Sequence, residues 1–313
     1  MTTIEDAVRD AHESARKVTG GANASYIPYL ASVDPELLGV AVVTVDGQVH
    51  AAGDSEFEFA IESISKVFTM ALAMEKVGAD DFRAKVGADA TGLPFNSVMA
   101  LELHHDLPVS PLVNAGAMAT ASLVPAKDAE DRWRQILNTQ SAFAGRDIAL
   151  SDEVNRSEQD TNFHNRAIAW LLYGVGAMYS DPMAACDVYT RQCSTLITTR
   201  DLAVMGATLA NDGVNPITGQ RVVRSENIPH ILAEMTMEGL YTTSGDWAYK
   251  VGLPGKSGVG GGILAVVPGE LAIAAFAPPL DKAGNSVRGQ AAVAGIARTL
   301  GLNLYAAGKR HRP

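Results

Sequence analysis

The feature that most constrains the fold is a pair of predicted β-hairpins near opposite ends of a chain of 313 residues. The first, 37-LLGVAVVTVDGQVHAAGD-54, has two β-rich runs joined by Asp-Gly, a dipeptide typical of tight turns. The second joins 262-GILAVVP-268 to 270-ELAIAAFAP-278 through a Pro-Gly turn. This order predicts an α+β fold, in which an antiparallel sheet built from both chain ends is flanked by helices.

Helical periodicity predicts the elements around this sheet. Apolar residues recur at helical spacing in segments 3–18, 63–77, 162–177, 199–211 and 287–301. Gly78 is expected to end the second helix, and Thr199 to be the N-cap of the fourth. Segment 162–177 is unusually apolar, so we expect it to be buried.

We expect residues 1–313 to form one domain with two lobes. The sheet lobe would comprise approximately residues 20–62 and 245–313, and the inserted helical lobe approximately residues 63–244. The sequence between the lobes has no clean linker, which predicts that the two lobes share one core.

The charge pattern argues against a nucleic-acid partner. The formal net charge is −10 and no basic stripe runs along the chain, whereas phosphate binding relies on clustered Lys and Arg. The short basic stretch 308-GKRHRP-313 is interpreted as a solvated terminus.

Hydropathy and cysteine usage predict a cytoplasmic protein with no membrane partner. The longest apolar stretch, residues 263–280, is interrupted by a Pro-Gly-Glu turn and is not expected to span a membrane. The acidic N-terminal segment lacks the basic start and apolar run of a signal peptide. Cys186 and Cys193 are too few for a disulfide framework and are predicted to be buried thiols, as in a reducing compartment.

The stretch 61-IESISKVF-68 places a lysine among apolar residues, one helical turn after a serine. A serine hydroxyl becomes a strong nucleophile only when a base takes its proton. Lys66 can be the base for Ser63, because apolar neighbours penalise the ammonium and favour the neutral amine. Unpaired N–H groups at a helix N-terminus would also suit an oxyanion. The pair therefore indicates a candidate acyl-enzyme site.

Ser-x-x-Lys alone is weak support, and an N-cap serine beside a snorkelling lysine would produce the same pattern. A second copy, Ser14-Ala-Arg-Lys17, stands among charged residues of the first helix and is interpreted as surface. The catalytic interpretation is favoured by 256-KSG-258, because serine acyl-enzymes carry such a triad on a late strand. Their third element, Ser-x-Asn, is matched only by 225-SEN-227, which we interpret as a surface turn.

Several segments together resemble the serine-dependent glutaminases of the β-lactamase/transpeptidase-like superfamily, in their compact bacterial form. These segments are 26-YIP-28, 59-FAIESISKVF-68, 113-VNAGAM-118, 155-NRSE-158, 162-NFHNRAIA-169, 189-YTRQCS-194, 201-DLAVMGATLAN-211 and 250-KVGLPGKSGVGGGILAVVP-268. The resemblance extends from about residue 20 to about residue 300. It implies hydrolysis of L-glutamine to L-glutamate and ammonia through a Ser-Lys acyl-enzyme, without a cofactor.

The resemblance also implies roles for individual residues. Ser63 would be the nucleophile, Lys66 its base and Tyr241 a catalytic tyrosine, with the Val259 N–H completing the oxyanion hole. Together with the Lys-Ser-Gly triad, it predicts these substrate-binding residues: Tyr26, Asn114, Glu158, Asn165, Tyr189, Lys256 and Ser257.

The chemistry of L-glutamine is compatible with this set, because the substrate is a zwitterion with a neutral terminal amide. Glu158 can pair with the α-ammonium, and Asn114 and Asn165 offer donors without a fixed charge. Asn165 lies about two turns after Glu158, so one continuous helix would direct both into the same cleft. His104 and His105 lack suitable partners and are interpreted as surface residues, so we expect no metal site.

Two alternatives remain open from the residues themselves. One is another serine acyl-enzyme hydrolase, such as a β-lactamase, a D,D-peptidase or an esterase. The other is a non-catalytic binding protein on the same scaffold. We further expect a homodimer or a homotetramer.

Overall fold

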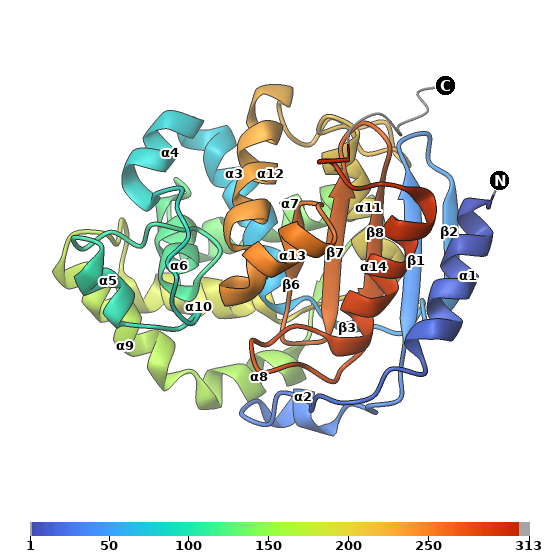
Figure 1. The fold of residues 1–313 in the computed structure, drawn as a ribbon. Helices are drawn as coiled ribbons and strands as arrows, with labels where there is room; N and C mark the ends of the chain where they lie inside the picture. The colour runs from blue at the N-terminus through green and yellow to red at the C-terminus, as the bar shows by residue number, and fades with distance from the viewer. Residues whose placement is uncertain (1, 307–313) are drawn as a thin grey trace.

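The computed structural model describes residues 2–306 and is drawn in Figure 1; the basic tail 308–313 lies outside this range. Its strands are β1 (Gly39–Thr44), β2 (Val49–Gly53), β3 (Phe59–Ala60), β4 (Ala149–Leu150), β5 (Thr195–Ile197), β6 (Gly255–Ser257), β7 (Gly262–Val267) and β8 (Leu271–Phe276). An antiparallel sheet has the strand order β2-β1-β8-β7-β6. The two ends of the chain meet where β1 pairs with β8, which confirms the expected sheet.

The helices occupy the middle of the chain and both of its ends. They are α1 (Ile4–Ala15), α2 (Pro28–Ser32), α3 (Ser65–Val77), α4 (Ala79–Val86), α5 (Met99–Leu103), α6 (Asn114–Leu123), α7 (Ala129–Ala144), α8 (Asp152–Thr161), α9 (Phe163–Gly174), α10 (Pro182–Cys193), α11 (Thr199–Ala210), α12 (Ile228–Glu238), α13 (Ser244–Lys250) and α14 (Val287–Leu300). Short 3₁₀ turns are η1 (Glu62–Ile64), η2 (Ser225–Asn227) and η3 (Tyr241–Thr243). The five helices predicted from periodicity are all present.

Both faces of the main sheet are covered, so β1, β7 and β8 are buried along their full length. Side chains alternate between the faces of a strand. In β1, Val40 and Val42 belong to the core beneath α1 and α14, which lie side by side in Figure 1. Ala41 and Val43 belong to the core on the other face, which includes α3 and α11. Helix α11 approaches so closely that a Cβ on Gly206 would lie 2.4 Å from the Leu264 side chain.

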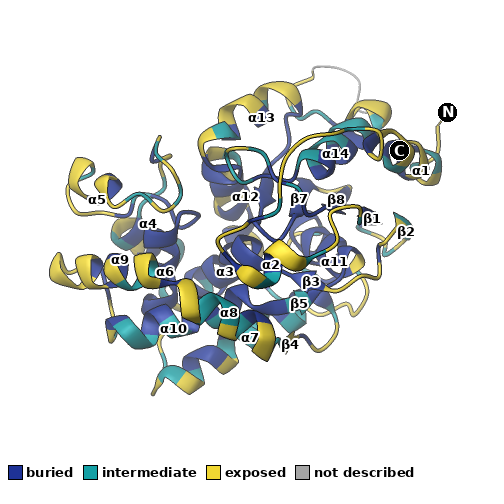
Figure 2. Cartoon of the chain, turned by 90° about the horizontal axis from the view of Figure 1, so that it is seen from below, coloured by how far each residue is buried: buried dark blue, intermediate teal, exposed yellow. Residues whose placement is uncertain are grey.

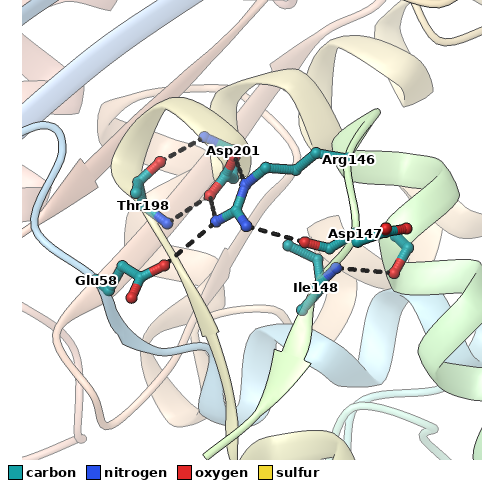
Figure 3. Close-up of polar contacts among 7 residues, drawn as sticks. Glu58, Arg146, Asp147, Ile148, Thr198 and Asp201 are labelled. Atoms are coloured by element: carbon teal, nitrogen blue, oxygen red, sulfur yellow. Dashed lines mark hydrogen bonds and ion pairs between the residues drawn. The ribbon is translucent and has the colours of Figure 1, made fainter.

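A second, small sheet of β3, β5 and β4 was not predicted, because its strands are only two or three residues long. A salt bridge stabilises it where β4 approaches α11 (Figure 3). Nε and Nη2 of Arg146 lie 2.8 and 2.5 Å from the two carboxylate oxygens of Asp201, and Glu58 lies 3.7 Å from the same guanidinium. Strand β3, which follows Glu58 and precedes η1, pairs with β5 through Phe59 and Ala60.

The N-cap of α11 is Thr198, not Thr199 as expected. The Thr198 hydroxyl accepts a hydrogen bond from the Asp201 N–H at 3.1 Å, and the Asp201 carboxylate accepts one from the Thr198 N–H at 2.7 Å. This reciprocal capping box requires a carboxylate three residues after the cap, and only Thr198 has that spacing to Asp201.

Helix α9 is present within segment 162–177, but the prediction that it is buried was wrong. Phe163, Trp170 and Tyr173 are 70%, 55% and 55% exposed. Figure 2 shows exposed residues along this helix at the edge of the molecule. Only one face of α9 packs, against α6 and α10. Apolar composition does not distinguish a helix buried on all sides from one that packs on a single side.

The second Ser-x-x-Lys copy and the Ser-x-Asn match lie in different surroundings. Ser14 and Lys17 are exposed at the end of α1, which agrees with a surface interpretation. Asn227, however, is buried and donates to the Glu75 carboxylate, so 225–227 is not a simple surface turn.

None of the helices in residues 2–306 combines the length and apolar character needed to cross a bilayer.

Candidate active site

Ser63 lies in η1, the 3₁₀ turn that precedes α3, and it is 6% exposed. The α-helix therefore begins at Ser65, two residues later than the sequence predicted. The preceding residue, Glu62, has a φ of +51°, a conformation that residues other than glycine rarely adopt. Such strain is characteristic of functional sites, where the surrounding packing maintains it.

Ser63 lines a narrow cavity of about 60 Å³, which shares residues with a neighbouring hollow of about 180 Å³. The cavity brings together these predicted site residues from distant parts of the sequence: Tyr26, Ser63, Asn114, Glu158, Asn165, Tyr189 and Val259. Tyr26 is 56% exposed and marks the mouth, whereas Tyr189 is 4% exposed. The Val259 N–H finds no acceptor among residues 2–306, as an oxyanion donor would require.

Lys66 lies in the first turn of α3 with only 1% of its surface exposed. Its Nζ donates to Asn114 Oδ1 at 2.7 Å and to the Leu112 carbonyl oxygen at 3.5 Å. Burial lowers the pKa of Lys66 to about 8, although nearby acidic groups partly oppose this effect. The amine is therefore in a surrounding where its neutral form is accessible near physiological pH.

Tyr241 connects Ser63 to a second buried lysine. Its hydroxyl lies 3.5 Å from the Ser257 carbonyl oxygen, and hydrogen bonding to Ser63 acts to lower its pKa. The Nζ atoms of Lys256 and Lys66 lie 4.2 and 5.9 Å from the centre of its ring. Burial raises the pKa of Tyr241, so its hydroxyl keeps its proton at neutral pH. Like Glu62, Tyr241 has a positive φ, of +56°.

The side chains of Lys256 and Ser257 do not line the cavity, although both were predicted to bind substrate. Lys256 is fully buried and donates to the carbonyl oxygens of Gly239 and Ser257 at 3.1 and 2.5 Å. Burial is the main cause that lowers its pKa, and the positive charge of Lys66 adds to it. The Ser257 hydroxyl donates to Asn285. Strand β6 thus places the Lys256 ammonium against the Tyr241 ring and the Ser257 hydroxyl against Asn285.

A chain of amide and hydroxyl groups connects Lys66 to the cavity wall. Tyr189 donates its hydroxyl proton to Asn114 Oδ1 at 3.1 Å, and Asn114 Nδ2 donates to Asn165 Oδ1 at 2.9 Å. Asn114 begins α6, Tyr189 belongs to α10 and Asn165 lies in the first turn of α9. Because these groups are uncharged, they can hold a polar substrate without fixing a charge near Lys66.

Glu158 and Asn165 do not lie on one continuous helix, because the chain breaks into two helices between them. Helix α8 ends at Thr161 and α9 begins at Phe163. The side chain of Asn162 at the break donates to Gln159 and Thr190, at 3.2 and 3.1 Å. Both predicted residues nevertheless line the cavity.

Sequence reasoning missed Glu62, which lines the cavity beside Ser63 and is 3% exposed. Burial and the neighbouring Glu158 carboxylate raise its pKa well above the ordinary range. Burial also raises the pKa of Glu158. The signal was present, because Glu62 is the other charged residue in the apolar stretch 59–68. Within residues 2–306, no three His, Cys, Asp or Glu side chains gather as a metal-ligand cluster.

Comparisons with known proteins agree with this geometry. The family model described as Glutaminase matches residues 21–305. A Glutaminase from Mycobacterium ulcerans is 69% identical over 302 residues, which cover 96% of this chain and 94% of the relative. A solved structure described as a probable glutaminase, ybaS, is 63% identical with a TM-score of 0.96, covering 96% of this chain and 98% of that one. A structure of Mglu in its glutamate form is 34% identical with a TM-score of 0.90, covering 96% of this chain and 69% of that one.

The match to the family model and the high identity over nearly full length leave no ambiguity about ancestry. The mixed architecture, an antiparallel sheet with many helices, is the β-lactamase-like fold of these structural neighbours. From its sequence, its fold and its relatives, this chain belongs to the glutaminase family.

Proposed function

We propose that this protein is a glutaminase, an amidohydrolase that converts L-glutamine to L-glutamate and ammonia through a Ser-Lys acyl-enzyme. The observation that carries the proposal is Lys66, buried one turn after Ser63 with a pKa lowered to about 8. A related structure, Mglu, is described in a glutamate form, which is the product expected here.

Substrate binding would use the charges and donors of the cavity. Glu158 faces the α-ammonium, and Asn114 and Asn165 donate to the α-carboxylate, while Tyr26 closes the mouth. Lys256 and Ser257 then act indirectly, because the Lys256 side chain and the Ser257 carbonyl oxygen contact Tyr241 rather than glutamine.

In the acylation step, Ser63 Oγ attacks the carboxamide carbon of glutamine and loses its proton to neutral Lys66. Tyr241, whose hydroxyl reaches Ser63, shares this proton, since the two hydrogen bonds of Lys66 go to Asn114 and Leu112. The tetrahedral oxyanion accepts hydrogen bonds from the N–H groups of Ser63 and Val259. Losing one such donor costs about 3–4 kcal/mol in comparable enzymes.

Collapse of the intermediate breaks the C–N bond, and the leaving amide nitrogen takes the proton from Lys66 and departs as ammonia. Water, deprotonated by the same amine, then attacks the γ-glutamyl ester. This second step releases L-glutamate and returns the proton to Ser63, so no cofactor is required.

Another serine hydrolase, such as a β-lactamase, is the alternative in the same chemical class. It would need a Ser-x-Asn element beside Ser63. The match at 225–227 forms η2 instead, where Asn227 contacts Glu75. No observation therefore favours this alternative.

The decisive experiment is the Ser63→Ala variant, assayed for ammonia release from L-glutamine. We expect turnover to fall to background, whereas the thermal unfolding midpoint stays near that of the parent protein. L-Asparagine and nitrocefin serve as competing substrates. Retained glutamine hydrolysis in a folded Ser63→Ala protein would refute the mechanism, and preferential nitrocefin hydrolysis by the parent would favour the alternative.

We also infer the setting in which this enzyme works. A homodimer or homotetramer is supported by the exposed apolar side chains of α9. A single catalytic domain comprising 1–313 is supported by the core that β1, β8, α3 and α11 share. A cytoplasmic location is supported by Cys186 and Cys193, both buried free thiols.

A further inference from the structure

Glu62 is a buried carboxyl group at the reacting centre for which the mechanism above has no role. Its Oε1 has no solvent exposure and no hydrogen-bond partner among residues 2–306. Its stem is tightly confined, because a Cβ on Gly258 would lie 3.3 Å from Glu62 Cβ and one on Gly260 would lie 3.2 Å from Glu62 Cγ. The glycines and the strained backbone therefore hold this side chain against the cavity.

Glu158 lines the same cavity as Glu62. The charge of Glu158 and hydrogen bonding to it both add to the effect of burial in raising the pKa of Glu62. Ionised carboxylates only accept hydrogen bonds, so two of them in contact in a buried site repel. One shared proton converts this repulsion into a short O–H···O bond. Glu62 is the more deeply buried of the two, which favours the shared proton on Glu62 rather than on Glu158.

We propose that Glu62 is a positioning residue for the substrate ammonium group. In its protonated form it donates a hydrogen bond to the Glu158 carboxylate and holds that single negative charge toward the α-ammonium of glutamine. The inference rests on the proposed glutaminase function and adds to it a proton that must be present for tight substrate binding.

The ionisable groups that face this pair set its pH dependence. Lys66 favours the ionised form of both carboxyl groups. The other ionisable groups facing the pair are neutral at pH 7, namely Tyr26, Tyr189, Tyr241 and Cys193. Because the pKa of Glu62 is raised well above that of an ordinary glutamate, the carboxyl group keeps its proton to higher pH than an exposed glutamate does. Losing the proton replaces the donated bond by repulsion and displaces Glu158. The KM for glutamine should therefore rise with pH while kcat rises through the titration of Lys66.

Two substitutions at Glu62 separate the donated hydrogen bond from the titration. Glu62→Gln retains a donor that does not titrate, so its KM should be near the neutral-pH value of the parent and stay constant between about pH 6 and 8, below the ionisation of the substrate ammonium. Glu62→Met has similar length and no donor, so its KM should be about ten- to hundredfold higher at every pH, which is the usual effect of losing a hydrogen bond to a charged group.

The same variants determine whether Glu62 is neutral. If Glu62 carries a proton, Glu62→Gln leaves the charge beside Lys66 unchanged. The pH at which kcat reaches half of its maximum (the acidic limb of the pH profile) should then stay near 8. An ionised Glu62 would stabilise the Lys66 ammonium, so its replacement would move that limb to lower pH. A glutamine analogue with hydrogen in place of the α-ammonium should show the same KM with the parent, Glu62→Gln and Glu62→Met.

A matched control is Glu234→Gln, because Glu234 is also a buried carboxyl group, 4% exposed with an unpartnered Oε2, but lines a different cavity. Its KM and pH profile should equal those of the parent. A parent KM that is flat with pH, a Glu62→Gln protein as weak as Glu62→Met, or a shifted kcat limb would overturn the inference. Absence of ammonia release from the parent protein would instead overturn the proposed function.

Discussion

Asn114→Asp should convert Lys66 from a base that works near pH 8 into one that works only in alkali. Asn114 Oδ1 lies 2.7 Å from Lys66 Nζ, and aspartate would place a carboxylate oxygen at the same point. Asn165 can rotate its amide to donate to the new carboxylate, so the cavity need not reorganise. The substitution therefore changes the charge at Lys66 with little change of shape.

The magnitude follows from the burial of Lys66. Its pKa is lowered from 10.5 to about 8, which corresponds to about 3 kcal/mol against the ammonium. At pH 7 about one-tenth of the protein carries the neutral amine, so the parent turnover should rise about tenfold by pH 9 and then level off. An opposite charge in contact raises such a pKa by about 1–3 units. Turnover of Asn114→Asp at pH 7 should thus fall about ten- to thousandfold.

The assay is ammonia release at saturating L-glutamine between about pH 6 and 10, because ionisation of the free substrate enters kcat/KM but not kcat. At pH 10, Asn114→Asp should recover to at least about a tenth of the parent turnover. Asn114→Ala removes the amide without adding a charge, so its acidic limb should not move upward. If Asn114→Asp lowers turnover equally at every pH and the pH of half-maximal turnover stays near 8, Lys66 is not the titrating base.

Two further predictions concern packing and stability. Gly260→Ala would place a Cβ 2.4 Å from the Ala60 carbonyl oxygen and 3.2 Å from Glu62 Cγ. We therefore expect a loss of about 1–3 kcal/mol in chemical denaturation and at least about tenfold in kcat/KM. The control Gly174→Ala has no atom within 4 Å of the added Cβ and should lower neither quantity. Burial raises the pKa of Glu234 from 4.5 to about 8, so the native state keeps a proton that the unfolded chain releases, and stability falls as pH rises between these values. Between about pH 5 and 8, the unfolding free energy of Glu234→Gln should fall less steeply with pH than that of the parent protein. The two slopes should differ by up to about 1.4 kcal/mol per pH unit. Equal slopes would contradict a protonated Glu234.

Elements whose causes are local could be predicted from the amino-acid sequence. The Asp-Gly turn specifies the β1–β2 hairpin, and Gly78, with a φ of +87°, ends α3 as its position predicted. Ser63 and Lys66 were predictable as a pair because one helical turn separates them. Helical spacing likewise predicted α1 and α14, since each has an apolar face that must pack on something.

Tertiary structure decided everything that depends on contacts between distant segments. The sequence does not show that Asn114 on α6 accepts from Lys66 on α3, or that Glu62 meets Glu158 on α8. It also does not show that Lys256 lies behind Tyr241, or that one face of α9 stays exposed. The pKa of a lysine or a glutamate depends on which groups surround it and on how much water they exclude. Those surroundings exist only when the chain is folded, so the sequence could predict the reacting groups but not the protonation states that make them reactive.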